Sequence, residues 1–169
     1  HWVASGPNVL AFEAELTAYV GGRPTRVMNS ATAAIEIALQ LCNIGPGDEV
    51  ILPAQTFFAA GNMVLKVGAK PVFVDVDLDT RNMNLAQTAA AITQRTKALL
   101  PVHVFGRPCP MPSYLQIAQK IGAAVVEDSC EAIGTTIGGK HAGTFGTAGM
   151  YAFYPNKQMT TGEGGIVIT

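Results

Sequence analysis

Apolar residues follow two alternating patterns along the chain. Stretches with an apolar position every three or four residues alternate with short runs of Val, Ile and Leu bounded by Gly or Pro. The first pattern is typical of amphipathic helices and the second of buried strands. The expected helices cover residues 8–20, 31–42, 58–67, 85–92, 112–121 and, as a short turn of helix, 129–133. The expected strands cover residues 49–52, 71–74, 98–102, 123–127, 149–153 and 165–169.

This order of elements predicts an α/β fold. Strands that are apolar throughout, and that are separated by helix-length segments, form a mainly parallel sheet with helices on both faces. The last two strands are joined by residues 154–164, a segment with no room for a crossover helix. We therefore expect this final pair to be antiparallel.

The segment that joins those two strands contains a lysine in unusual surroundings. Lys157 lies in YPNKQMTTGEGG, residues 154–165, just before a turn bounded by glycines. A lysine that forms a Schiff base must be held at a fixed distance from an aldehyde and partly desolvated, because only its neutral amine is a nucleophile. A surface lysine in a hairpin turn would fit the same segment, which alone does not distinguish the two.

An aspartate ends the strand before it. Asp128 follows the apolar run 123–127, so it should lie at the carboxyl end of a parallel strand, where open α/β sheets bind ligands. Pyridoxal 5'-phosphate (PLP) needs such a carboxylate, which keeps the ring nitrogen protonated so that the ring withdraws electrons from the substrate. An N-cap of a helix over 129–133 is the alternative role, and the presence of Lys157 favours the cofactor.

Two segments nearer the start could complete such a site. Ser30 and Thr32 begin the expected helix 31–42, where free N–H groups, the helix dipole and a hydroxyl would bind a phosphate. Both are also ordinary capping residues. Phe57 follows the strand 49–52, where an aromatic ring can stack on a planar cofactor. The alternative is that the Phe57 side chain packs in the hydrophobic core.

Composition and charge narrow the possible classes of function. Hydrophobic residues make up 49% of the chain and charged residues 14%, with a net charge of −1. This balance argues against a disordered chain, and the absence of a basic run argues against nucleic-acid binding. No apolar run is long enough for a membrane span. The three cysteines have no CxxC spacing and are typical of reduced thiols in a cytoplasmic protein, and the scattered histidines form no metal motif.

Seven short motifs follow one another along the chain: SATAA (30–34), GPGDEV (45–50), TF (56–57), VGAKPVFVDVD (67–77), VHVFG (102–106), ED (127–128) and PNKQMTTGEGG (155–165). In this order they resemble one family, the DegT-type PLP-dependent nucleotide-sugar aminotransferases. The match runs from about residue 12 to residue 169. Each motif is weak by itself, whereas the series at this spacing is specific. The resemblance implies the seven-stranded, mainly parallel large domain of the fold-type-I PLP-dependent transferases.

The resemblance also implies roles for individual residues. Lys157 matches the lysine that holds PLP as a Schiff base and then moves the substrate proton. Asp128 matches the partner of the ring nitrogen. Thr32, with the backbone around Ala31 and Ala33, matches the phosphate site. Phe57 matches the aromatic residue that stacks on the ring.

Activity and partners follow from the same resemblance. Glutamate or glutamine would donate an amino group to a keto sugar linked to UDP or dTDP. The family forms homodimers that share active-site residues, and its members have a smaller C-terminal domain. We therefore expect residues 1–169 to be an incomplete PLP-binding large domain that lacks the small domain.

Three positions refine the prediction. The dehydratase branch of the family has histidine where this chain has Lys157, so amino transfer is favoured. Glu131 occupies a cofactor-contacting position, where the family often has glutamine or histidine, and its carboxylate would repel the phenolic oxygen of PLP unless one of them is protonated. Ala152 replaces a serine that commonly binds the phosphate. Glu131 and Ala152 leave open an alternative, a PLP-fold ligand-binding or regulatory protein without turnover.

Overall fold

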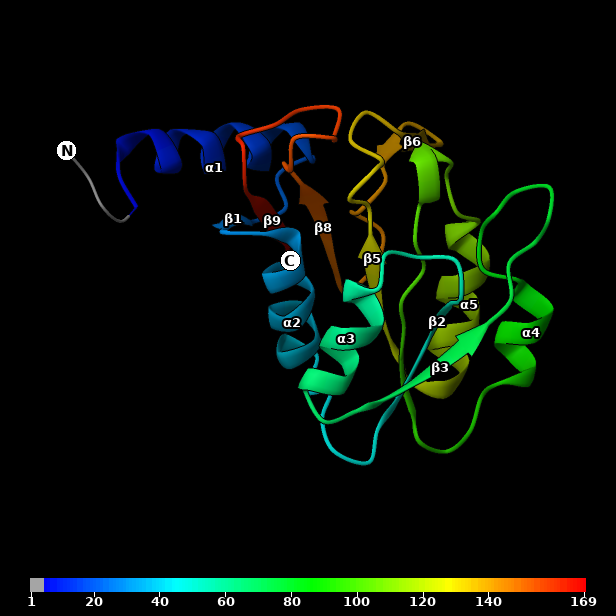
Figure 1. Ribbon diagram of the computed structural model, residues 1–169. Helices are drawn as coiled ribbons and strands as arrows, with labels where there is room; N and C mark the ends of the chain where they lie inside the picture. Colours follow the sequence, from blue (N-terminus) through cyan, green and yellow to red (C-terminus); the bar gives the residue numbers. More distant parts are fainter. Residues whose placement is uncertain (1–4) are drawn as a thin grey trace.

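The computed structural model describes residues 5–169 and has the predicted α/β architecture (Figure 1). The helices are α1 (Pro7–Tyr19), α2 (Ala31–Leu41), α3 (Ala59–Lys66), α4 (Leu85–Ala90), α5 (Met111–Ile121) and the 3-10 helix η1 (Val104–Gly106). The strands are β1 (Thr25–Met28), β2 (Glu49–Pro53), β3 (Lys70–Val74), β4 (Thr96–Leu99), β5 (Ala124–Asp128), β6 (Thr136–Ile137), β7 (Lys140–His141), β8 (Ala148–Ala152) and β9 (Gly165–Ile168).

Seven strands form one sheet in the order β1-β9-β8-β5-β4-β2-β3, and β6 and β7 form a separate hairpin. Every pairing from β8 to β3 is parallel, whereas β9 is antiparallel to both β8 and β1. The predicted mainly parallel sheet and the antiparallel final pair are thus confirmed. The seven strands also agree with the number that the resemblance implied.

Helices cover both faces of the sheet. Alternate residues of each strand point to opposite faces, so Leu52 and Val126 pack against α2 and α3, whereas Ile51 and Val125 pack against α5. At the other end of the sheet, Tyr151 packs beneath α1. Figure 1 shows α2 beside α3, and α4 beside α5. Burial on two faces explains why the strands are apolar throughout.

Local expectations differ from the structure in three places. The segment 129–133 forms turns and not a helix. Strand β4 ends at Leu99, and beyond it only Val102 forms an isolated parallel bridge with Asp128. Strand β1 and the β6–β7 hairpin were not predicted.

The carboxyl ends of β2, β4, β5 and β8 lie along one edge of the sheet. The chain leaves β2 toward β3 on one side and continues from β4 toward β5 on the other. Such a reversal opens a crevice beyond the strand ends, where α/β sheets bind ligands. The predicted site residues that follow these strands are therefore brought to one place.

Candidate active site

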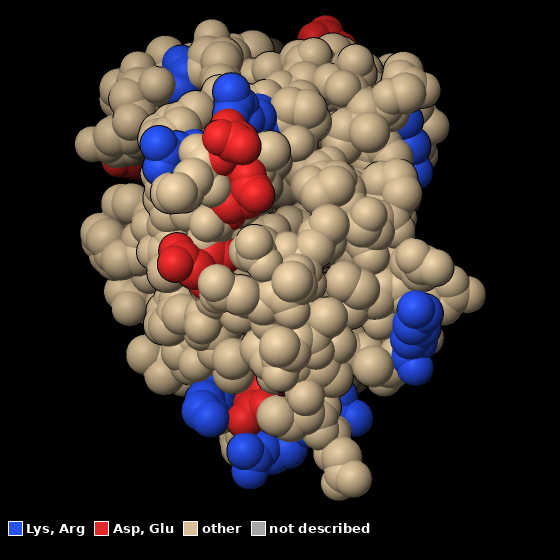
Figure 2. All heavy atoms as spheres, turned by 90° about the vertical axis from the view of Figure 1, so that its right-hand side faces the viewer, with Lys and Arg blue, Asp and Glu red and all other residues tan. Residues whose placement is uncertain are grey.

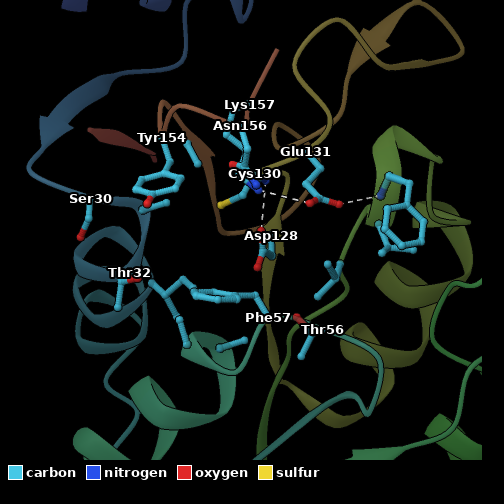
Figure 3. Close-up of a pocket in the computed structure, with 18 of the residues that line it drawn as sticks. Ser30, Thr32, Thr56, Phe57, Asp128, Cys130, Glu131, Tyr154, Asn156 and Lys157 are labelled. Atoms are coloured by element: carbon cyan, nitrogen blue, oxygen red, sulfur yellow. Dashed lines mark hydrogen bonds and ion pairs between the residues drawn. The ribbon is translucent and has the colours of Figure 1, made fainter. Parts of the chain in front are cut away.

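A pocket of about 710 Å³ opens at the carboxyl ends of these strands (Figure 3). Lys157, Asp128, Glu131, Phe57, Thr32 and Ala31 all line it. Ser30, Thr56, Cys130, Ala152, Tyr154 and Asn156 are among its other lining residues. Residues that lie more than 120 positions apart in the sequence therefore share one cavity.

The N-terminus of α2 forms one wall of the pocket. Ser30 caps the helix, and its Oγ accepts a hydrogen bond of 3.2 Å from the N–H of Ala33. Ala33 is not a lining residue, and this bond already occupies its N–H group. The N–H groups of Ala31 and Thr32 donate no hydrogen bond to any residue that the structure describes. Two free N–H groups at the positive end of a helix dipole form an anion site.

Asp128 lies at the opposite wall, at the end of β5, and is only 6% exposed. Its Oδ1 accepts a hydrogen bond of 3.1 Å from the N–H of Cys130, which closes a turn. Since no helix follows, the alternative of a helix N-cap is wrong. Its Oδ2 accepts no hydrogen bond from residues 5–169. A carboxylate this buried requires a further donor.

Lys157 reaches into the pocket from the loop between β8 and β9. Its side chain is 16% exposed, and the backbone turns through a bond of 2.9 Å from Lys157 N to Tyr154 O. Its Nζ lies 3.2 Å from Oε1 of Glu131 (Figure 3). The alternative of a solvent-exposed hairpin lysine does not describe this side chain.

Glu131 is held from three sides. Besides its contact with Lys157, its Oε2 accepts a hydrogen bond of 2.8 Å from the N–H of Phe105. The amide of Gln158 donates to its backbone carbonyl. In this arrangement the carboxylate fixes the position of the lysine amine, a contact that the sequence did not predict.

Phe57 lines the pocket and is 66% exposed, so it does not pack in the core. Its ring lies against that of Phe58, with 4.3 Å between the centroids. Figure 3 shows Phe57 between Thr32 and Thr56 at the floor of the pocket. An exposed ring at this place can stack on a planar ligand.

Two lining residues were missed as candidates. The hydroxyl oxygen of Thr56 is buried and has no hydrogen-bond partner among residues 5–169. Such an atom marks a place where a polar group of a ligand would bind. The only sequence signal was its place directly before Phe57. Cys130 also lines the pocket, and burial, followed by the nearby charge of Asp128, raises the pKa of its thiol well above the ordinary value.

The other acid of the pair, Glu127, lies outside the pocket. It is fully buried, and it accepts hydrogen bonds from the N–H groups of Gly143 and Phe145 and from Nε2 of His103. Nδ1 of His103 in turn accepts a hydrogen bond of 3.0 Å from the N–H of Cys109. His103 and Glu127 are therefore structural residues.

Three broader findings concern residues 5–169. None of their helices is both long and apolar enough to span a bilayer. No three of their His, Cys, Asp or Glu side chains are grouped to hold a metal ion. All three cysteines are free thiols.

The fold and the pocket define an α/β protein with a partly buried lysine and a buried aspartate that face one pocket at the strand ends. The chain belongs to the DegT/DnrJ/EryC1/StrS aminotransferase family, which it matches over residues 1–169. It is 47% identical over 160 residues to UDP-N-acetyl-3-dehydro-alpha-D-glucosamine 3-aminotransferase of Acidithiobacillus ferrooxidans, with 94% of this chain and 43% of the relative covered. It is 42% identical over 169 residues to GDP-perosamine synthase of Caulobacter vibrioides, with 99% of this chain and 46% of the relative covered.

A solved structure agrees closely with the fold. A protein of Streptococcus pneumoniae, crystallised in PLP and PMP forms, superposes with a TM-score of 0.95 and is 34% identical. The alignment covers 99% of this chain and 46% of that one. The chain thus spans less than half the length of the relatives that it matches.

Proposed function

We propose that this chain is the large-domain part of a PLP-dependent sugar aminotransferase. The complete enzyme would move an amino group from glutamate or glutamine to a keto sugar linked to a nucleotide. The observation that carries the proposal is the meeting of Lys157, Asp128 and the free N-terminus of α2 in one pocket. Each of the three meets a different chemical requirement of the cofactor.

The lining residues fit PLP group by group. The N–H groups of Ala31 and Thr32 and the Thr32 hydroxyl would hold the phosphate, and Ala152 contributes no donor. The open Oδ2 of Asp128 would accept the ring N–H, and Phe57 would stack on the ring. The unpaired hydroxyl of Thr56 would supply a further hydrogen bond to the bound ligand.

When bound, PLP supplies a protonated ring that withdraws electrons from the carbon whose proton is removed. Asp128 would keep the ring protonated, because its buried carboxylate forms no ion pair within residues 5–169. Lys157 would bind the cofactor covalently through Nζ and, when released, would carry the proton between the reacting carbons. Glu131 holds the free amine of Lys157 in place between these steps, through the contact at 3.2 Å.

The substrate and the assembly are proposed from the relatives and the surface. Relatives act on UDP-linked and GDP-linked sugars by their names, and we favour UDP or dTDP for this chain. We also propose a cytoplasmic homodimer. Free thiols agree with a reducing compartment. Phe58 and Tyr154 are aromatic residues near the pocket whose side chains are more than half exposed, and a partner subunit would cover them.

Borohydride trapping in the full-length protein tests the proposal. Reduction of the PLP-loaded protein should fix PLP on Lys157, as read by mass spectrometry of the peptides. Lys157→Ala should abolish the adduct, whereas Lys140→Ala, which changes a lysine outside the pocket, should retain it. The assignment of Lys157 as the PLP-binding lysine would be contradicted by an adduct that persists after Lys157→Ala on another lysine, namely Lys66, Lys70, Lys97, Lys120 or Lys140.

A non-enzymatic PLP-binding protein is the second candidate, because Glu131 and Ala152 depart from the family pattern. Glutamate separates the two. In an aminotransferase the visible absorption band of bound PLP moves to the position of the pyridoxamine form when glutamate is added. A band that stays in place with glutamate and with glutamine would favour binding without turnover.

A further inference from the structure

A second cavity of about 610 Å³ adjoins the pocket. It is lined by Leu78, Asp79, Arg81, Phe105 and Arg107. Phe105 lines both cavities, so they meet at this residue. The loop that carries Arg81 joins β3 to α4 at the right-hand side of Figure 1, the side turned toward the viewer in Figure 2.

Within the described part of the chain, the two arginines of this cavity are not paired with acidic side chains, unlike two other arginines. Arg26 and Arg95 lie within 4 Å of glutamates. Neither Arg81 nor Arg107 has an acidic partner within that distance among residues 5–169. Figure 2 shows that Lys and Arg atoms on this side form small separate groups. Two guanidinium groups that line one cavity and have no acidic partner among the described residues are available for an anion.

The cavity also contains one carboxylate. Asp79 is exposed, and Arg107 donates to its backbone carbonyl and not to its side chain. Two arginines and one aspartate leave the lining with a formal charge of +1. The cavity therefore favours an anion over a cation.

Hydrogen bonds hold the loops that carry the arginines. Oδ1 of Asp77 accepts hydrogen bonds from the N–H groups of Asp79 and Thr80, at 3.1 and 3.0 Å, and Arg81 N donates to Asp77 O at 2.7 Å. Asn82 donates to Pro108 O at 2.8 Å and so ties this loop to the one that carries Arg107. A site held in this way needs little ordering when a ligand binds.

Two backbone conformations point to the same place. Phe105 and Arg81 have φ angles of 55° and 62°, which bulky residues seldom adopt. Such conformations persist only where the surrounding structure enforces them, and they gather at ligand sites. At Phe105 the conformation leaves the ring 73% exposed over the cavity.

The cavity is close to the reactive lysine. Oε1 of Glu131 lies 3.2 Å from Lys157 Nζ, and its Oε2 accepts the N–H of Phe105 at 2.8 Å. One carboxylate therefore separates the lysine from the residue that the two cavities share. A ligand with a sugar near Lys157 could extend past Phe105 to the arginines.

We propose that Arg81 and Arg107 bind the diphosphate of the nucleotide-linked sugar, and that Phe105 stacks on its base. The inference rests on the proposed function, and adds the place where the nucleotide half binds. Guanidinium groups match phosphate oxygens in charge and geometry. An exposed phenyl ring offers a face for a planar base.

Calorimetric titration of the full-length, PLP-loaded protein with UDP and with inorganic pyrophosphate tests this. A charge-assisted hydrogen bond corresponds to about tenfold in affinity or more. Arg81→Ala and Arg107→Ala should each weaken both probes by about tenfold, and the double variant by more. Arg26→Ala, which removes an arginine paired with Glu13 elsewhere, should change neither. Phe105→Ala should weaken UDP and spare pyrophosphate.

The outcomes separate this inference from the proposed function. In the arginine variants, the borohydride adduct and the spectral response to glutamate should remain normal, because neither arginine lines the lysine pocket. Unchanged UDP and pyrophosphate affinities in correctly folded double variants would overturn the diphosphate site alone. If the borohydride adduct is missing but UDP binding still depends on the arginines, the proposed aminotransferase function would be contradicted and the diphosphate site would be supported.

Discussion

Side chains along β5 point alternately to opposite sides of the strand. This alternation decides which of two neighbouring acids faces the pocket. Glu127 points into the protein and accepts hydrogen bonds from the backbone of the loop before β8, at 2.9 Å from Gly143 N. Asp128, one residue further, points into the pocket. Two adjacent carboxylates thus have separate tasks, one structural and one available to a ligand.

Asp128→Asn tests the second task. The side-chain oxygen of asparagine can still accept the hydrogen bond from Cys130 N–H. The amide is neutral, however, and cannot stabilise the positive charge of a protonated cofactor ring. We expect an unchanged unfolding midpoint and a loss of about a thousandfold in turnover, or ~4 kcal/mol of transition-state stabilisation. Steady-state kinetics and thermal unfolding of the full-length protein measure both.

Glu127→Gln is the matched control, because it changes the neighbouring acid by the same chemistry. It should lower stability, since it weakens several buried hydrogen bonds at once. Normal turnover in Asp128→Asn would show that the carboxylate is not needed by the cofactor.

At the scale of individual residues, part of the site was predictable from the sequence. Lys157, Asp128, Thr32 and Phe57 lie in motifs, and the structure brings them to one pocket. The ion pair between Glu131 and Lys157 was not predictable, because it depends on a loop held by Phe105 and Gln158. The unpaired hydroxyl of Thr56 was missed for a related reason, since hydrogen-bond satisfaction is a property of the folded surroundings.

At the scale of elements, long amphipathic helices and buried strands were predicted to within a few residues. The expected helix 129–133 was wrong because Asp128 bonds to Cys130 N–H and turns the chain toward the β6–β7 hairpin. Strand β1 was missed because it has only four residues, one of them Arg26, and pairs with β9 near the other end of the chain. Local pattern cannot reveal a pairing that distant.

The placement of α2 depends on a glycine of β9. A Cβ on Gly165 would lie 2.3 Å from the backbone N of Ala31, closer than any real contact. The absence of a side chain therefore lets the strand touch the start of the helix. The last of the three glycines in the lysine segment is explained by this contact with α2.

Gly165→Ala should consequently disturb both stability and the phosphate site. Overpacking of this kind costs typically 1–3 kcal/mol, and contact with backbone atoms places this case near about 3 kcal/mol. The displaced N-terminus of α2 should also weaken PLP binding. Urea unfolding and PLP titration of the full-length protein measure the two effects.

Gly45→Ala is the control for this substitution. Its Cβ would meet nothing closer than 3.9 Å, and its φ angle is not positive. It should leave PLP affinity unchanged and alter stability little. Equal behaviour of the two alanine variants would show that the contact between β9 and α2 does not position the helix.

At the scale of the molecule, the two edges of the parallel sheet have different tasks. The carboxyl edge carries the pocket, whereas the amino edge carries a charge cluster around Glu49, the first residue of β2. Glu49 is buried and accepts hydrogen bonds from Thr93 Oγ1 at 2.6 Å, Lys70 Nζ at 3.2 Å and Arg95 Nη2 at 2.9 Å. Lys70 begins β3 and Arg95 directly precedes β4, so one carboxylate ties three strands together.

This cluster makes the stability of the fold depend on pH. The hydrogen bond from Thr93, followed by those from Lys70 and Arg95 and the charge of Arg95, lowers the pKa of Glu49 from 4.5 to about 2. A carboxyl group whose pKa is lower in the folded state stabilises the fold above its unfolded pKa. Its contribution should therefore be complete at neutral pH and be lost as the pH falls from about 4.5 to 2.

Glu49→Gln tests this dependence. The variant should unfold at lower urea concentration than the parent at pH 7, and the difference between the two should shrink progressively below pH 4.5. Urea titrations of the full-length protein between pH 7 and pH 3 follow that difference. PLP affinity at pH 7 should stay the same, because Glu49 lies at the edge of the sheet opposite the pocket. A stability difference that is constant across this pH range would mean that the glutamate acts through its shape and hydrogen bonds alone, and not through its charge.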